Sequence, residues 1–492
     1  MPAHLQTPGG DIAANLASFA NLEVLSGDGA SPLEAWDLIY RAVAHVRSGA
    51  GPCLLRLRVP RLQGHTFVDD QAYKSAATRL EESARDPLLK LRQLLKAQPS
   101  RNQSWEALLA DVNQELELAV LQAEAQPQPA PEQATCHLFF NGQAPLQGGL
   151  RPENAQLATG TSQPEPSGAR VNFIDAVRRT LESEMRRNPR LLVFGEDVGV
   201  KGGVHGATLD MQAHFGPQRV FDTSLSEDAI IGRALGMAIA GLLPVPEIQF
   251  RKYADPAHEQ ITDIGTLRLR TANRFAAPLV VRIPVGFGKK TGDPWHSVSG
   301  EAIYAHTPGW RLAYPSNAAD AAGLLRSALR GDDPTLFFEH RLLLDTAEGR
   351  RPYPGDEYCL PFGQAAILTE GDELTLITWG AMLPRCQAAA AAFPGRVQVI
   401  DLRTIHPWDQ DTVLESVHRT GKVLVVHEDT LTGGFAGEIL AVIAEQAFTS
   451  LDAPLARLAT PDIPIPFNAG LMDAVLPSQA SIQSRIAALL TY

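Results

Sequence analysis

The second half of the chain alternates between short hydrophobic runs and segments in which hydrophobic residues recur at helical spacing. The runs include LLVFG, PLVVRIPVG, PTLFFEH, LTLITWG and KVLVVHED. Segments with helical spacing include residues 172–187 and 227–243. Nearly continuous apolar strands separated by helices are typical of parallel sheets that are covered on both faces. The pattern therefore predicts an α/β fold with two α/β domains, joined near residues 345–365.

The first 125 residues follow a different, mostly helical pattern. Ser31, Pro32 and Glu34 predict a helix start with an N-cap, a proline at the first position and a capping box. Hydrophobic residues then recur at helical spacing as far as Val46, and glycines follow. Further along, the sequence predicts a strand, a polar loop and a second amphipathic helix, at residues 53–59, 61–71 and 104–124.

A segment rich in Pro, Gln, Ala and Gly separates these two parts of the chain. It runs from about Gln122 to Ala169 and shows no hydrophobic periodicity. Such a composition is typical of a linker, because proline fixes φ and disfavours helix in the residue before it. Its one apolar stretch, CHLFF at 136–140, is expected to dock as a short strand.

Length, charge and cysteine content narrow the possible functions. A chain of 492 residues allows about three domains. Its net charge of −12 argues against a nucleic-acid or membrane-surface partner, since both usually require a basic surface. The four cysteines form no CxxC motif, and no apolar run approaches a membrane span. The N-terminus lacks a signal-peptide pattern, so we expect a soluble, cytoplasmic, multidomain enzyme.

Several polar residues lie where strands are predicted to end, which is where parallel sheets form ligand crevices. Glu227 follows such a strand and begins an apolar helix. Position alone favours a carboxylate stabilised by the helix dipole, but in an apolar crevice it could hold a proton for a ligand ring nitrogen. Tyr253 could stack on a ligand ring, although a core position is the favoured interpretation.

Two loop histidines are candidate acids or bases. His296 lies beside Trp295 in the polar, Gly-rich segment 288–302, and on local grounds a surface histidine is equally plausible. His65 lies in the loop after the strand at 53–59, with Arg61 before it and two aspartates after it. A solvated loop is an equally plausible interpretation of that segment.

Two glycine-rich stretches resemble ligand loops only weakly. Gly27-Asp28-Gly29 directly precedes a helix cap, so a turn is the better interpretation. The region 197–206 lacks the strict G-x-G-x-x-G order of a dinucleotide loop.

Taken together, the motifs resemble one family, the thiamine diphosphate-dependent decarboxylating component of the 2-oxoacid dehydrogenase complexes. Residues 171–490 resemble its beta subunit nearly end to end, and residues 21–125 resemble the tail of its alpha subunit. The stretches that carry the beta resemblance are GEDVG, GGV, FDTSLSE, AGLLPVPEIQF, HSVSGEA, PSNAADAAGLL, IDLRTIHPWD and HEDTLTGGFAGEI. The alpha resemblance rests on VLSGDGASPLEAWDLIYRAV and RLQGHTFVDDQAY.

The resemblance implies a thiamine diphosphate-binding, transketolase-like fold in a fused alpha–beta chain. A partial alpha-type domain at 1–125 precedes a linker at 126–169. A pyrimidine-binding domain at 170–350 and a transketolase C-terminal-like domain at 351–492 complete the expected order.

One departure from the family concerns the metal. The family binds diphosphate and magnesium through G-D-G and an Asn roughly 30 residues later, whereas the first Asn after Gly29 is Asn102. The magnesium ligands are therefore expected to be absent from this chain. Either the chain is truncated, or a separate polypeptide carries the missing alpha-subunit region. The family's potassium ligands are poorly reproduced, so we expect no potassium site from the resemblance.

The resemblance also assigns roles to the candidate residues. Glu227 matches the glutamate that hydrogen-bonds the aminopyrimidine ring, and Tyr253 matches the aromatic that packs on that ring. His296 matches a histidine near the substrate. His65 matches the alpha-loop histidine near the diphosphate, and Arg61 in the same loop is taken as a cofactor-binding residue.

The implied reaction is oxidative decarboxylation of a 2-oxoacid, with acyl transfer to the lipoyl group of an acyltransferase partner. Branched-chain 2-oxoacids of the 3-methyl-2-oxobutanoate type are the favoured substrates, with pyruvate and acetoin as alternatives. An inactive or structural fragment remains a second possibility, while the alpha-like tail argues against a transketolase-type transferase. Small residues along 227–243 predict a homo-oligomer through close helix contacts.

Overall fold

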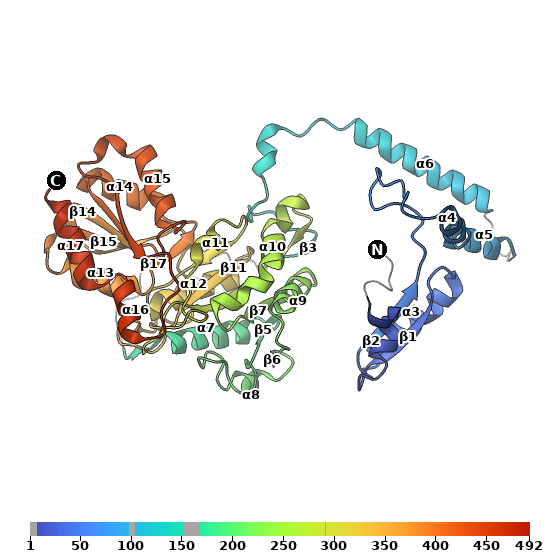
Figure 1. The fold of residues 1–492 in the computed structure, drawn as a ribbon, viewed down its shortest axis with the longest axis horizontal. Helices are drawn as coiled ribbons and strands as arrows, with labels where there is room; N and C mark the ends of the chain where they lie inside the picture. The colour runs from blue at the N-terminus through green and yellow to red at the C-terminus, as the bar shows by residue number, and fades with distance from the viewer. Residues whose placement is uncertain (1–6, 98–103, 151–167, 291) are drawn as a thin grey trace. The chain divides into compact units, whose positions relative to one another are not determined.

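The structure is a computed structural model that describes residues 7–97, 104–150, 168–290 and 292–492. The chain forms two compact units, Met1–Pro129 and Ala130–Tyr492 (Figure 1). Of the helices within the described ranges, none combines the length and hydropathy that crossing a membrane requires.

The N-terminal unit contains a two-stranded parallel sheet of β1 (Glu23–Asp28) and β2 (Cys53–Arg58), connected through α3 (Pro32–Arg47). Its other helices are η1 (Pro8–Gly10), α2 (Ile12–Leu16), α4 (Ala76–Ala84), α5 (Pro87–Ala97) and α6 (Trp105–Glu124). The helix, strand and loop expected from residues 31–71 are confirmed, and so is the helix at 104–124.

The predicted capping box of α3 is wrong. Ser31 occupies the N-cap position but makes no side-chain cap hydrogen bond. Glu34 instead accepts a hydrogen bond of 2.8 Å from the backbone N–H of Asp28, at the end of β1. Gly27 allows this approach, because an added Cβ would lie 2.4 Å from Glu34 Oε1. The Gly-Asp-Gly triplet thus belongs to the strand-to-helix turn.

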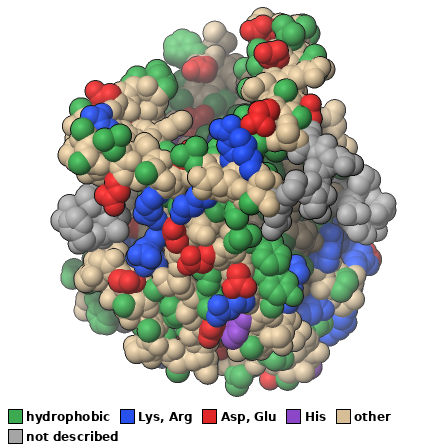
Figure 2. Space-filling view, turned by 90° about the vertical axis from the view of Figure 1, so that its right-hand side faces the viewer, with side chains coloured by type: hydrophobic (Ala, Val, Ile, Leu, Met, Phe, Trp, Pro, Cys, Tyr) green, Lys and Arg blue, Asp and Glu red, His purple; other side chains and the backbone are tan. Residues whose placement is uncertain are grey.

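The helices of this unit leave much apolar surface uncovered. Only Leu38 of α3 is buried, whereas Trp36 is 67% exposed and stacks on Tyr40, which is also exposed. Helix α6 buries none of its residues within the described chain. Exposed hydrophobic side chains lie between charged ones in the space-filling view (Figure 2). A helix that is apolar on several sides is typical of the interior of a larger domain.

The second unit contains a seven-stranded sheet in the order β16-β10-β11-β9-β7-β5-β6. Its strands are β5 (Leu191–Gly195), β6 (Val220–Asp222), β7 (Leu243–Glu247), β9 (Val280–Val285), β10 (Arg311–Ala313), β11 (Thr335–His340) and β16 (Thr404–His406). The helical segments that precede or connect these strands include α7 (Phe173–Arg187), α8 (Met211–Phe215), α9 (Glu227–Ile239), η3 (Arg251–Ala257), α10 (His258–Arg270), α11 (Glu301–Ala305) and α12 (Ala318–Arg330).

A five-stranded sheet follows in the order β13-β15-β14-β17-β18. Its strands are β13 (Ala366–Thr369), β14 (Gly371–Thr378), β15 (Gly395–Asp401), β17 (Val423–Thr430) and β18 (Ala456–Thr460). Its helices are α13 (Met382–Ala390), α14 (Gln410–Thr420), α15 (Ala436–Gln446), η4 (Phe448–Ser450), α16 (Ala469–Val475) and α17 (Gln479–Leu490). Two short pairs, β3 (Gln147–Gly148) with β8 (Phe275–Ala276) and β4 (Arg170–Val171) with β12 (Arg351–Pro352), lie outside both large sheets.

Both large sheets are mainly parallel, which confirms the predicted fold class, but each ends in an antiparallel strand. β13 runs antiparallel to β15, and β16 crosses from the later part of the chain to pair antiparallel with β10. Each of the two main hydrophobic clusters contains residues from both sheets. The two sheets therefore share continuous cores. The domain limits at 125/126, 169/170 and 350/351 stay predictions.

The expected strand at 136–140 is wrong, although that segment does dock. Phe140 donates its backbone N–H to Asp333 at 2.7 Å, and the Phe139 ring lies 4.9 Å from the Arg311 guanidinium. The regular pairing occurs later, between β3 and β8. Aromatic rings over arginines supply the contact that a strand was expected to make. Residues 151–167 of the predicted linker lie outside the described residues.

Candidate active site at the carboxyl ends of the seven-stranded sheet

The parallel strands of the large sheet bring several polar and aromatic residues to one edge. Glu196 follows β5, Phe250 follows β7, and Arg341 follows β11. Helix α9 begins at Glu227, shortly after β6. Ligand crevices in α/β proteins form at this edge, because loops there carry side chains from several strands.

Two carboxyl groups interact at the start of α9. Glu196 is only 6% exposed, and its Oε1 has no hydrogen-bond partner among the described residues. Burial raises the pKa of Glu196, and the charges of Glu227 and Asp197 raise it further. Glu227 itself is half-buried at the helix N-terminus. The negative charge of Glu227 disfavours ionisation of Glu196, so the Glu196 carboxyl holds a proton more strongly than an isolated carboxyl does.

Aromatic and imidazole rings cluster around Phe250. His296 lies 4.4 Å from Phe250, centroid to centroid, and Tyr253 lies 5.8 Å from it. The Tyr253 hydroxyl is 2.9 Å from His296 Nε2, so the two predicted site residues form a hydrogen bond. Gln249 precedes Phe250 in the sequence, and its side-chain amide donates a hydrogen bond of 3.2 Å to the backbone carbonyl of Glu196. This hydrogen bond links Glu196 to the ring cluster.

The loop that bears His296 is held from two sides. Asp293 Oδ2 lies 3.0 Å from His296 Nδ1. Arg341 donates to the His296 carbonyl at 2.8 Å, and its guanidinium lies over the Phe250 ring at 5.2 Å. The orientation of the His296 imidazole is therefore set by the Asp293 carboxylate and by the hydrogen bond from Arg341 to the His296 backbone carbonyl.

A second histidine, His205, lies edge-on to the Phe250 ring at 5.6 Å. Burial lowers the pKa of His205 to about 4, and the positive charges of Arg341 and Arg282 act in the same direction. This histidine is neutral at physiological pH and presents an imidazole without charge.

A fully buried ion triad lies under the site. Arg282 donates to Glu339 at 2.7 and 2.9 Å and to Glu247 at 2.7 Å. Burial acts against the charged form, but the two carboxylates raise the pKa of Arg282 above its ordinary value. The triad ties together β7, β9 and β11, whose ends carry the site.

His65 and Arg61 lie in the N-terminal unit, where they contact each other at 3.3 Å. The Asp69 carboxylate accepts the His65 backbone N–H at 2.7 Å, which lowers the pKa of Asp69. Both His65 and Arg61 are exposed. Among the described residues, no three His, Cys, Asp or Glu side chains are grouped as a metal site would require.

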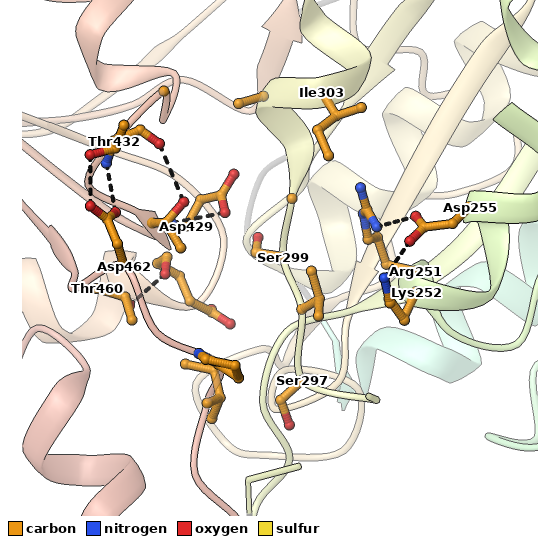
Figure 3. Close-up of a pocket in the computed structure, with 18 of the residues that line it drawn as sticks. Arg251, Lys252, Asp255, Ser297, Ser299, Ile303, Asp429, Thr432, Thr460 and Asp462 are labelled. Atoms are coloured by element: carbon orange, nitrogen blue, oxygen red, sulfur yellow. Dashed lines mark hydrogen bonds and ion pairs between the residues drawn. The ribbon is translucent and has the colours of Figure 1, made fainter. Parts of the chain in front are cut away.

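A cavity of about 1190 Å³ is lined in part by the residues that flank His296 in the sequence (Figure 3). Its lining combines residues around α11, including Ser299, with residues after β17 and β18, including Thr432 and Asp462. Neither Glu227, Tyr253 nor His296 lines it. Its size alone therefore does not make this cavity the reactive centre.

A buried carboxyl lies at the start of α11, next to this cavity. Glu301 accepts from Ser299 at 2.6 Å and from the Trp379 indole at 2.9 Å. Burial, followed by the charge of Asp429, raises the pKa of Glu301 to about 8. Glu301 therefore keeps its proton near neutral pH.

Sequence profiles of three known domains match this chain. Residues 169–346 match the transketolase pyrimidine-binding domain, residues 363–482 the transketolase C-terminal domain, and residues 11–132 the dehydrogenase E1 component. Together with the fold, the matches define a class of thiamine-dependent enzyme subunits with transketolase-type domains behind an E1 segment.

Within this class, the chain belongs to the E1 beta subunits of the 2-oxoacid dehydrogenases. It is 43% identical over 298 residues to the 2-oxoisovalerate dehydrogenase subunit beta of Bacillus subtilis, which covers 60% of this chain and 90% of that protein. It is 39% identical over 304 residues to the pyruvate dehydrogenase E1 component subunit beta of the same organism, covering 61% and 93%. The family resemblance and the expected enzyme class are confirmed.

A solved structure supports the same fold at lower similarity. A split-gene transketolase, described as an inactive beta4 tetramer, superimposes with a TM-score of 0.53 at 19% identity. The match covers 65% of this chain and 99% of that one.

Sequence reasoning missed four residues of the site: Glu196, His205, Asp293 and Arg341. Glu196 lies in the GEDVG stretch at the end of a predicted strand. That position could have identified it as a candidate site residue. His205 lay in the segment that was discounted as a dinucleotide loop. Arg341 and Asp293 become visible only when the loop ends are brought together in space.

Proposed function

We propose that this chain binds the aminopyrimidine half of thiamine diphosphate and takes part in oxidative decarboxylation of a 2-oxoacid, with acyl transfer to a lipoyl group. The observation that carries the proposal is the buried, unpartnered Glu196 carboxyl, whose pKa is raised by burial and by the charge of Glu227, at the same sheet edge as the Tyr253–His296 hydrogen bond. A proton-holding carboxyl beside an aromatic cluster suits a heteroaromatic ring with basic nitrogens.

The residues present fit the pyrimidine half of the cofactor. Glu196 Oε1 and Thr223 Oγ1 are buried without hydrogen-bond partners among the described residues, and both belong to loops at the edge where α9 begins. Buried polar atoms without partners are costly, so they support a polar ligand at this edge. For the diphosphate and magnesium, we propose the missing alpha-subunit region, supplied by a longer form of this chain or by a separate polypeptide, with His65 and Arg61 contributing from the residues given.

The chain's own residues would bind, orient and move protons. Glu227 would hold the proton that a pyrimidine ring nitrogen shares, and the raised pKa of Glu196 favours a second protonated carboxyl in the same crevice. Tyr253 packs against the ring. His296 exchanges a proton with the substrate through Nε2. When bound, thiamine diphosphate supplies the nucleophilic carbon and the electron sink that decarboxylation requires.

For the substrate, we propose branched-chain 2-oxoacids of the 3-methyl-2-oxobutanoate type. The 43% identity to a 2-oxoisovalerate dehydrogenase subunit supports this choice over pyruvate, for which the corresponding identity is 39%. Comparing kcat/KM for 3-methyl-2-oxobutanoate, pyruvate and acetoin in the complemented system tests the choice. A preference for pyruvate or acetoin would overturn it.

For partners, we propose a lipoylated acyltransferase and a second copy of this chain. Exposed Gly236 on α9 has open space around the position of its missing Cβ, which allows close approach of another helix. Sedimentation should show a species larger than the 53.1 kDa chain at micromolar concentration.

The decisive experiment replaces Glu227. After complementation with the alpha-subunit region, Glu227→Gln should slow 2-oxoacid decarboxylation by ~10²–10⁴-fold, because glutamine keeps the shape but cannot exchange a proton. Exchange of the cofactor's thiazolium proton, followed by NMR, should slow in parallel.

The matched control is Asp228→Asn, which changes the neighbouring exposed carboxylate that accepts from Ser226. It should retain near-normal rates. Normal proton exchange in Glu227→Gln would remove Glu227 from the mechanism. A wild-type chain that stays inactive after complementation would favour a structural subunit instead.

A further inference from the structure

The loop that carries His296 contains a carboxylate with two separate sets of contacts. Asp293 Oδ1 accepts the backbone N–H of Trp295 at 2.6 Å and that of His296 at 3.2 Å. Its Oδ2 lies 3.0 Å from His296 Nδ1. One oxygen therefore shapes the turn, and the other faces the imidazole.

On the far side of the ring, His296 Nε2 lies 2.9 Å from the Tyr253 hydroxyl. A neutral imidazole has one donor nitrogen and one acceptor nitrogen. A carboxylate can only accept, so Nδ1 must carry the hydrogen, and Nε2 then accepts from Tyr253. The contacts define a chain of hydrogen bonds from Tyr253 through His296 to Asp293.

Asp293 is charged under ordinary conditions. Burial acts to raise its pKa, but the hydrogen bonds from the His296 ring and from the backbone of Trp295 and His296 outweigh burial and lower it. The Arg341 guanidinium, which holds the His296 carbonyl, interacts electrostatically with the same carboxylate. An ionised acceptor fixes a histidine tautomer more strongly than a neutral one.

We propose that Asp293 is a positioning residue that fixes His296 in the Nδ1–H tautomer, leaving Nε2 as the proton acceptor of the site. This inference rests on the function proposed for His296. A proton taken up at Nε2, in place of the hydrogen bond from Tyr253, gives an imidazolium whose charge the Asp293 carboxylate compensates at Nδ1. Asp293 acts through His296 and needs no contact with the substrate.

The test reads the tautomer directly in the full-length chain, with ¹⁵N-labelled histidine and NMR, and needs no cofactor. His296→Gln identifies the signals of His296. We expect the hydrogen on Nδ1 in the wild-type chain. In Asp293→Asn, Oδ1 keeps the two backbone hydrogen bonds, but an amide NH₂ replaces Oδ2 and donates to Nδ1, so the hydrogen should move to Nε2.

Tyr253→Phe provides a second variant if Asp293→Asn does not fold. It removes the hydroxyl at Nε2 but leaves the carboxylate, so the Nδ1–H tautomer should persist. An Nε2–H tautomer in the wild-type chain would overturn the proposal. So would an unchanged tautomer in Asp293→Asn, or a changed one in Tyr253→Phe.

Activity gives an independent readout in the complemented system. Asp293→Asn should lower kcat at least about tenfold with little change in cofactor affinity, because the tautomer is wrong while the turn is kept. Asp345→Asn is the control, since Asp345 is an exposed carboxylate that pairs with Lys289 at 3.9 Å. An unchanged kcat in Asp293→Asn would overturn the role. An inactive wild type would refute the proposed function, and the NMR result would still decide the tautomer.

Discussion

Two tryptophans show how differently the two units of this chain use their hydrophobic residues. Trp310 in the second unit is fully buried and donates its indole N–H to the Ile261 carbonyl at 2.7 Å. Trp36 in the first unit is 67% exposed and contacts Tyr40 on the same helix. Both lie in segments whose sequences are rich in hydrophobic residues, so hydrophobicity alone does not determine burial.

The difference lies in the available neighbours. Residues of the second unit pack between two sheets and their helices, and nearly all of α12 is buried. The first unit has two strands and a few helices, which is too little structure to cover α3 on all sides. Its uncovered apolar faces agree with the proposal that another polypeptide contributes to the alpha-type region.

Breaking the buried triad of Arg282, Glu247 and Glu339 should produce the largest difference in stability between the two units. Arg282→Met would leave Glu247 and Glu339 as uncompensated buried charges, so unfolding of the second unit should become about 5 kcal/mol easier. Denaturant unfolding, followed by a probe in each unit, should show the first unit unchanged. Equal destabilisation of both units would contradict their independence.

The two tryptophans provide a matched pair for the next test. Trp310→Ala should destabilise the second unit by about 3–5 kcal/mol, because it removes a fully buried side chain. Trp36→Ala should change stability by no more than about 0.5 kcal/mol in this chain. A large cost at Trp36 would show that another surface covers α3.

The effect per pH unit of titrating Glu301 is smaller than that of either Arg282→Met or Trp310→Ala. Folded Glu301 holds its proton up to about pH 8, whereas its unfolded form releases it above its ordinary value of 4.5. Unfolding between these values releases a proton, so the stability of the second unit should fall as pH rises from 5 to 8. The slope is at most ~1.4 kcal/mol per pH unit.

Glu301→Gln should remove this slope, because glutamine does not titrate. Glu445→Gln, at an exposed position on α15, should leave it in place. Thermal unfolding at several pH values measures both. A slope that persists in Glu301→Gln would assign it to other groups.

The hydrophobic pattern was enough to predict the main apolar strands of the second unit and helices such as α7 and α9, because these segments have a clear periodicity. It could not predict the antiparallel strands β13 and β16, since strand direction depends on distant partners. The predicted capping box of α3 is absent because Glu34 instead accepts a hydrogen bond from the backbone N–H of Asp28 in β1. Local sequence does not contain such contacts.

The candidate site residues also fall into two groups, those that the sequence predicted and those that only the structure reveals. Glu227, Tyr253 and His296 were predicted from motifs, and the structure places a hydrogen bond between Tyr253 and His296. Asp293 was not found, although it lies three residues before His296. Only the folded turn shows that its carboxylate points back to the ring. His205 was overlooked because its importance depends on burial against Phe250.

The antiparallel strand β16 has a consequence for synthesis on the ribosome. Strand β10 at residues 311–313 ends the parallel part of the large sheet, and within the described part of the chain the strand at residues 404–406 pairs with its other edge. Until that later segment emerges, the nascent chain presents an open strand that can pair with another molecule. We therefore expect chains interrupted between these two strands to depend on chaperones, and the finished chain to close its own edge.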